Sequence, residues 1–160
     1  MKKNLDMETS TGCVDTASRR NGFRRQQGRF QIIPFRPRHV RLILPDATDS
    51  MITRAEYAVE NGFSYTACLL GTPIGAAGMC FKEANTAELW AMFTPLFKSM
   101  PITLYRAVRE KYAEAMSKAP ELERIYAIVD PRDETAIRFV QHLGLKMTNH
   151  VYEVEVKSHG

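Results

Sequence analysis

The sequence predicts an α/β protein with one mixed sheet, in which an antiparallel meander is followed by a β-α-β crossover. Three apolar stretches at residues 64–70, 74–81 and 86–93 are separated by short polar or glycine-containing segments, as in hairpins. A helical pattern over residues 102–117 then precedes a fourth apolar stretch at residues 124–130. Because a strand, a helix and a strand in this order form a parallel crossover, both kinds of strand pairing are expected in one sheet.

An outer strand and two helices are expected before the meander. The stretch RFQIIPF suits a first strand, which Pro37 helps to end, and residues 38–44 suit a helical turn. A longer helix is expected over residues 51–61, with Asp49 and Ser50 as N-cap candidates and Asn61-Gly62 as its end.

Within the meander, Gly71-Thr72-Pro73 is the turn signal that joins the first two apolar stretches. The helix over residues 102–117 is amphipathic, and its Glu114 is one turn from Lys118, at a spacing that favours an ion pair.

The remaining elements follow the apolar stretch at residues 124–130. Asp130-Pro131 and Asp133 are starting signals for another amphipathic helix, and Gly144 is placed to end it. The last strand is expected in HVYEVEV, whose alternation leaves one face polar.

Length and composition bound the class of protein. A chain of 160 residues with 44% hydrophobic content is sufficient for one domain with a substantial core. The three cysteines are widely spaced and suggest neither a disulfide framework nor a zinc site, so we expect reduced thiols and a cytoplasmic protein. No apolar stretch approaches the length of a membrane span or forms the core of a signal peptide, so no membrane partner is expected.

Positive charge is concentrated near the N-terminus. Residues 16–45 contain eight arginines and no acid or lysine, whereas the whole chain has a net charge of +4. Residues 1–29 are therefore expected to form a basic, disordered tail, followed by a folded domain over residues 30–156 and a short tail at 157–160. The tail is interpreted either as an arm for nucleic acid or another polyanion, or as a solvated segment that aids solubility.

Three segments carry a resemblance to a known family: YTACLLGTPIGAAGMCF, AELWAMFTP and DETAIRFVQHLGLKM. In this order and separation they resemble the second to fourth strands and the last helix of the Gcn5-related N-acetyltransferase (GNAT) superfamily. The resemblance implies a GNAT-like fold whose sheet splays between its fourth and fifth strands. It also implies that acyl-coenzyme A, such as acetyl-CoA, lies in the gap, with an amine as acceptor.

The resemblance places the phosphate-binding loop of the family at Lys98, Ser99, Met100, Ile102 and Thr103. The family pattern has glycines in this loop, but here Pro101 lacks an N–H group and Thr103 has a Cβ atom where the phosphates should come close. The loop is therefore degenerate as a phosphate cradle, and weak binding of coenzyme A is expected. The alternative interpretation is purely structural: Pro101 begins the helix and Ser99 caps it.

The resemblance also suggests catalytic positions. Many family members use a tyrosine on the last helix as the general acid, but the matching residue is Val140, which cannot donate a proton. Tyr105, Tyr126 and Tyr152 are the substitutes considered for that role. Glu88 lies where some members have the carboxylate that deprotonates the amine, although an ordinary solvent-facing strand residue is the alternative.

Two functions remain open. The first is an acyl-CoA dependent N-acyltransferase. The second is a non-catalytic protein, because ELWAMFTP, the basic helix after it and IRFVQHLGLKM also resemble the GNAT-like internal virion or morphogenesis proteins of short-tailed bacteriophages. That alternative would place the protein in a host cytoplasm or virion and would give the arginine-rich tail nucleic acid or virion proteins as partners.

Overall fold

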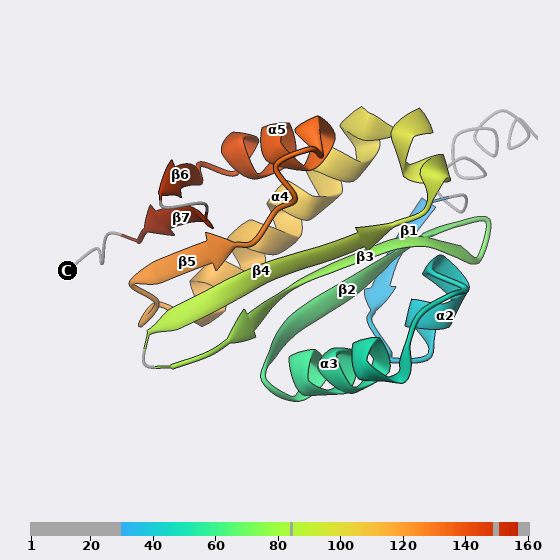
Figure 1. Cartoon of the computed structure of the whole chain (residues 1–160), viewed down its shortest axis with the longest axis horizontal. Helices are drawn as coiled ribbons and strands as arrows, with labels where there is room; N and C mark the ends of the chain where they lie inside the picture. Colours follow the sequence, from blue (N-terminus) through green and yellow to red (C-terminus); the bar gives the residue numbers. More distant parts are fainter. Residues whose placement is uncertain (1–29, 84, 149–150, 157–160) are drawn as a thin grey trace, which may run out of the picture.

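The computed structural model describes residues 30–83, 85–148 and 151–156, and it confirms the predicted mixed α/β fold (Figure 1). The expected tails at residues 1–29 and 157–160 lie outside this part of the chain. The described strands are β1 (Phe30–Pro34), β2 (Gly62–Leu69), β3 (Thr72–Phe81), β4 (Thr86–Phe93), β5 (Arg124–Ala127), β6 (Lys146–Thr148) and β7 (Val151–Glu155). The described helices are α2 (His39–Ile43), α3 (Asp49–Glu60), the 3₁₀ helix η2 (Pro95–Ser99), α4 (Pro101–Lys118) and α5 (Glu134–His142).

The strands form one sheet in the order β1-β2-β3-β4-β5-β7-β6. The first four strands are antiparallel neighbours in chain order, which confirms the meander. Strand β5 pairs parallel to β4, because α4 carries the chain back along the sheet between them. The predicted crossover is therefore confirmed. Strand β7 lies between β5 and β6 and is antiparallel to both.

The turn between β2 and β3 differs from the prediction. Leu69 is paired with Thr72, so the turn consists of Leu70 and Gly71 alone, and Thr72 and Pro73 belong to β3. Both turn residues have positive φ, 52° and 80°. Two such residues give a turn whose twist matches that of the flanking strands. The predicted turn at Gly71-Thr72-Pro73 was wrong because Pro73 serves as a strand residue beside a register shift, where a missing N–H group is tolerated.

Helix α3 ends as predicted but begins differently. Its N-cap is Thr48, not Asp49 or Ser50, and the Thr48 side chain makes no capping hydrogen bond. Asp49 lies in the first turn, where its negative charge suits the helix dipole, and it accepts a hydrogen bond from Arg41 at 2.8 Å. At the other end of the helix, Gly62 follows the C-cap residue Asn61 and begins β2. This position requires glycine, because a Cβ atom would lie 1.9 Å from the carbonyl oxygen of Met79.

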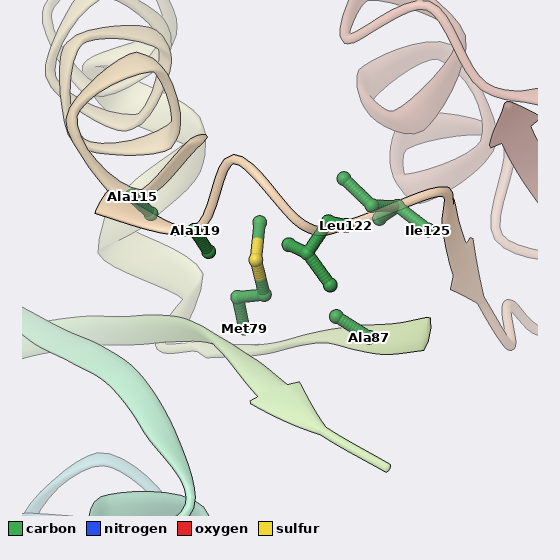
Figure 2. Packing of buried hydrophobic residues seen from close by; sticks show 6 residues of the cluster. All are labelled: Met79, Ala87, Ala115, Ala119, Leu122 and Ile125. Carbon is green, nitrogen blue, oxygen red and sulfur yellow. The ribbon is translucent and has the colours of Figure 1, made fainter. Parts of the chain in front are cut away.

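Helices cover both faces of the sheet (Figure 1). On one face α2 and α3 pack on the strands through a cluster that includes Val40, Ile43, Ala55 and Ala76. On the other face α4 packs on β3 and β4, and Figure 2 shows Met79 pointing from β3 toward the segment that follows α4. The members of this second cluster are Met79, Ala87, Ala115, Ala119, Leu122 and Ile125.

Strand β6 was not predicted. Its residues Lys146, Met147 and Thr148 are all exposed, so they have no apolar alternation that would mark a strand. They become a strand only because β7 folds back beside them. No helix among the described residues is long and apolar enough to cross a membrane.

Candidate functional site

The centre of the candidate site is the place where β4 and β5 separate. The two strands pair only over Thr86–Leu89 and Arg124–Ala127. Strand β4 continues through Trp90–Phe93, whereas β5 ends and Ile128 is 71% exposed. The predicted strand over residues 124–130 is therefore too long by three residues. Along Trp90–Phe93 the backbone groups directed toward β5 have no strand partner among the described residues, and they remain free to bind something else.

An open cleft of about 1180 Å³ occupies this separation. It lies between the second half of β4, the inner face of α4 and the segment from β5 into α5. Its walls are mostly apolar, and they include Phe93, Val108, Ala127, Phe139 and Val140. Volumes of roughly 300 to 1,000 Å³ are typical of small-molecule sites, so this cleft is large enough for an extended ligand.

One part of the cleft, which we call the hollow, lies beneath the middle of α4. Its floor is a row of residues paired across three strands: Tyr65 of β2, Ala77 of β3 and Ala91 of β4. Ala91 lies on the free edge of β4 and is exposed, and Ala77, which is paired on both sides, is only half-buried. The sheet is therefore uncovered at this point, directly under a helix.

The rim of the hollow carries a cluster of charges on α4. Glu114 accepts hydrogen bonds from Lys111 at 2.6 Å and from Lys118 at 2.5 Å, which confirms the predicted pair with Lys118. These two lysines, Lys111 first, lower the pKa of Glu114 to about 2. The Tyr65 hydroxyl donates to the same carboxylate at 3.4 Å, and the Lys111 ammonium lies 4.9 Å from the centre of the Tyr65 ring. The charge of Lys111 is thus already matched by a carboxylate.

The segment from β5 into α5 forms the opposite wall. Asp130 accepts hydrogen bonds from the Arg132 side chain at 2.8 and 3.0 Å, and these hold the pKa of Asp130 below its usual value. Asp133 caps α5 as predicted, because its side chain accepts from the backbone N–H of Ala136 at 3.0 Å. All three charged residues line the cleft. The ion pair of Asp130 with Arg132 and the cap that Asp133 gives to α5 therefore fix this wall.

Tyr112 is a cleft residue that sequence reasoning missed. It lies on the inner face of α4, and its ring packs against the cluster shown in Figure 2. Burial raises the pKa of Tyr112, so its hydroxyl stays protonated at neutral pH. The hydroxyl makes no hydrogen bond to any residue in the described ranges. Helical periodicity indicates a core position for Tyr112. Its place in the cleft depends on the small residues Ala77 and Ala91 of the sheet, which the sequence of the helix does not reveal.

Trp90 touches the cleft at the free edge of β4, but its ring packs on the opposite face of the sheet. There it contacts Phe35, with 5.1 Å between the ring centroids. Its indole Nε1 is buried without a hydrogen-bond partner in the part of the chain that the structure describes, and it lies over Gly78, where a Cβ atom would come within 2.8 Å of it. Trp90 is the single tryptophan of the chain. Its ring lies on the face of the sheet that α2 and α3 cover, so its fluorescence reports on the cleft through the backbone of β4, at whose free edge Trp90 lies.

The predicted phosphate loop lies near the cleft but does not line it. Lys98 and Ser99 end η2, Met100 is the N-cap of α4, and Pro101 begins the helix as predicted. The predicted cap by Ser99 is wrong, because its hydroxyl donates to the Leu96 carbonyl oxygen at 2.6 Å within η2. Thr94, Pro95, Phe97 and Leu104, on either side of the loop, do line the cleft.

Two backbone donors remain at the start of α4. The first α-helical bond of the helix runs from the Leu104 N–H to the Met100 carbonyl oxygen at 3.1 Å. The N–H groups of Ile102 and Thr103 precede it and have no partner within the helix, and both side chains are exposed. Such a terminus attracts anions.

The structure does not bring Glu88 together with this loop. Glu88 alternates with Ala87 and Leu89 along β4 and so lies on the side of the sheet that Trp90 shares with α2 and α3. There its carboxylate forms an ion pair with Lys82 at 3.0 Å, and it does not line the cleft. Tyr126 is its partner on β5.

The tyrosines considered as substitutes for Val140 also lie elsewhere. Tyr105 donates to the His142 carbonyl oxygen at 3.3 Å, and Tyr152 is buried in a cluster between α5 and β7. Neither these two nor Tyr126 lines the cleft, whereas Val140 does.

Comparison with known proteins identifies the fold. No family model matches the chain, and no curated protein gives a significant match. The chain is similar to a solved acetyltransferase from Streptococcus agalactiae, with a TM-score of 0.65 and 16% identity over 79% of this chain and 98% of that one. It is also similar to the ribosomal-protein-S18-alanine N-acetyltransferase of Escherichia coli, with a TM-score of 0.63 and 15% identity over 82% and 96% of the two chains. A GNAT-family acetyltransferase from Streptococcus pneumoniae gives 0.57 and 14% identity, over 80% and 99%. The fold is therefore that of GNAT acyl-CoA N-acyltransferases.

Proposed function

We propose that the protein is an acyl-CoA dependent N-acyltransferase that transfers an acyl group, such as acetyl, to an amine. The observation that carries this proposal is the separation of β4 from β5 after Leu89, which opens the cleft beside an unpaired strand edge. An edge of this kind can hydrogen-bond the amide groups of a pantetheine arm as it would bond a strand. The apolar walls suit the remainder of the arm.

The start of α4 would hold the phosphates of the coenzyme. The free N–H groups of Ile102 and Thr103 and the positive end of the helix dipole favour an anion there, with Lys98 nearby in sequence. Pro101 removes one donor from this turn. We therefore keep the assignment of Lys98, Ser99, Met100, Ile102 and Thr103 as a proposal and expect the coenzyme to bind weakly.

Tyr112 is our candidate for the proton donor. In the reaction the amine nitrogen attacks the thioester carbonyl carbon and loses a proton to solvent, the carbon–sulfur bond breaks, and the thiolate of coenzyme A takes up a proton. A hydroxyl that is protonated at neutral pH and has no partner in the described chain is suited to give that proton. Glu88 has no part in this proposal, since its carboxylate lies outside the cleft.

Binding and turnover test the proposal separately. Titration of the full chain with acetyl-CoA should change the fluorescence of Trp90, and a panel of amines should release free thiol from acetyl-CoA in its presence. A fluorescence change that is saturable but comes without thiol release from any amine would count against catalysis. The absence of any acetyl-CoA binding at millimolar concentration would count against the whole assignment.

A second candidate function is a non-catalytic protein with this fold. What favours it is that Val140 stands at the position of the proton donor and Pro101 in the phosphate loop. The narrower resemblance to bacteriophage virion or morphogenesis proteins belongs to this candidate, as does the arginine-rich segment. Binding of acetyl-CoA without turnover would favour it over the first.

A further inference from the structure

We propose that the hollow beneath α4 receives the acyl chain of the donor, and that the preferred donor is therefore a medium-chain acyl-CoA and not acetyl-CoA. This inference rests on the proposed acyltransferase function. It names the class of acyl group that the same cleft would select.

The hollow is a gap between two well-packed parts of the core. Toward the start of α4, Leu104 is buried in a cluster with Ile74 and Phe97. Toward its end, Ala115 is buried with Met79 in the cluster of Figure 2. Between them, Ala107 and Val108 line the cleft and belong to no buried cluster of the described residues, whereas Tyr112 already packs against the second cluster.

The floor of the hollow shows how unusual this gap is. A residue in the central part of a sheet that is covered by a helix is normally buried. Ala77 of β3, which is paired on both sides, is instead only half-buried, and its cross-strand neighbour Ala91, on the free edge of β4, is exposed. Larger side chains at these two positions would fill the space, since interiors otherwise pack to a density that leaves few voids. The sequence thus keeps apolar surface accessible beneath α4.

The hollow also leads away from the separated strands. The cleft borders β4, continues over Ala77 of β3 and reaches Tyr65 and Phe63 of β2. Neighbouring strands lie about 4.8 Å apart, so β2 lies roughly 10 Å to the side of β4. An acetyl group on a thioester held beside β4 would leave this space vacant, whereas a chain of several methylenes would extend into it.

The chemistry of the walls selects an alkyl chain over a charged group. Ala77, Ala91, Ala107 and Val108 offer only apolar atoms from their side chains. Both ammonium groups at the rim, those of Lys111 and Lys118, are already paired with Glu114, Lys111 at 2.6 Å. A carboxylate on the acyl group would have to compete with these pairs, whereas a methylene chain would not.

Binding of a series of thioesters tests the inference. We would titrate the full chain with coenzyme A, acetyl-CoA, butanoyl-CoA and hexanoyl-CoA and measure binding by calorimetry. Each buried methylene is expected to tighten binding by about fourfold, so hexanoyl-CoA should bind on the order of a hundredfold more tightly than acetyl-CoA. Equal affinities for these two, with measurable binding of coenzyme A, would overturn the acyl hollow and leave the proposed function standing. Failure of every member to bind would overturn both.

Substitutions within the hollow locate the effect. In Ala91→Leu, and separately in Ala77→Leu, the new side chain should fill the hollow, and hexanoyl-CoA should bind no more tightly than acetyl-CoA. The matched control is Ala113→Leu, because Ala113 is exposed on α4 and does not line the cleft. It should keep the full preference for the longer chain. A preference that survives in both hollow variants, with thermal unfolding showing them folded, would overturn the assignment.

Discussion

Leu89 of β4 and Ala127 of β5 form the last residue pair that joins these strands. Before this pair the sheet is continuous, and after it the same strand β4 offers a free edge to the cleft. The backbone of Leu89 therefore supports the sheet, whereas that of the next residue, Trp90, is available to a ligand.

The first prediction concerns the start of α4. Replacing Pro101 and Thr103 by glycine restores one backbone donor and removes a Cβ atom near the proposed phosphate site. We expect acetyl-CoA to bind about ten- to a hundredfold more tightly, because a hydrogen bond to a charged group contributes roughly 1.5 to 3 kcal/mol. Fluorescence titration measures the change. Pro45→Gly, at an exposed proline in the segment between α2 and α3, is the control and should have no effect. Unchanged affinity in the double variant would mean that the phosphates bind elsewhere.

The second prediction concerns Tyr112. Tyr112→Phe removes the hydroxyl that we assign as proton donor and keeps the ring that packs against the core. We expect kcat to fall by about 10²- to 10⁴-fold while KM for the acyl donor changes little. Tyr105→Phe is the matched control, since that hydroxyl bonds to His142 outside the cleft. Equal activities in the two variants would exclude Tyr112 from proton transfer.

The third prediction concerns Glu88. Glu88→Gln should leave the transfer rate within the range of the unsubstituted protein, because the carboxylate faces Lys82 and not the cleft. Stability should fall by less than about 1 kcal/mol, as is usual for a partly exposed ion pair. Steady-state kinetics and urea unfolding measure the two effects. A drop in kcat of two orders of magnitude would restore Glu88 as the general base.

The fourth prediction concerns the pH dependence of stability through His39. This residue is 5% exposed, and its Nδ1 accepts from the Arg36 backbone N–H at 3.3 Å and lies 2.9 Å from the Thr66 hydroxyl. Burial, and then the charges of Arg38 and Arg36, lower the pKa of His39 from its usual 6.5. The unfolded chain therefore binds a proton that the folded one rejects, and stability present above pH 6.5 should be lost as the pH falls below it.

Urea unfolding at several pH values checks this. His39→Gln should lose part of the slope below pH 6.5, whereas His142→Gln, at an exposed histidine of α5, should keep it. The same slope in all three proteins would show that His39 is not the group responsible.

The fifth prediction concerns the arginine-rich segment at residues 16–45, five of whose eight arginines lie outside the described residues. If its arginines contact nucleic acid, affinity for duplex DNA should fall steeply with salt. Replacing Arg19, Arg20, Arg24, Arg25 and Arg29 by glutamine should flatten that dependence. A filter-binding titration at several salt concentrations measures it, and an unchanged slope would remove the arm as a polyanion site.

Much of the fold could be predicted because the information was local. Turn signals, alternating apolar residues and the helical period of residues 102–117 were sufficient to order β2, β3, β4, α4 and β5. Strand β6 could not be predicted, since it depends on pairing with β7 and not on its own side chains. The Leu70-Gly71 turn was missed because leucine rarely adopts positive φ.

The candidate site was less predictable, for a different reason. Glu88 and Ala91 lie on the same strand, but the sequence does not reveal which face of β4 meets α4 and which meets α3. Tyr112 has the spacing of a core residue. Its access to the cleft depends on the small side chains of Ala77 and Ala91 across the sheet. Such relationships arise only when distant segments pack.

The short pairing between β4 and β5 has a consequence for hydrogen exchange. Among the described residues, strands β5, β7 and β6 pair with the rest of the sheet only through Thr86–Leu89, so this end can open without disrupting the pairing of β1 to β4. Its amides should then exchange with solvent at a lower opening free energy than those of β2 and β3. A ligand that contacts both the free edge of β4 and the start of α5 would join β5, β7 and β6 to strands β1 to β4. The slowest-exchanging amides would then include those of β5 as well as those of β2 and β3.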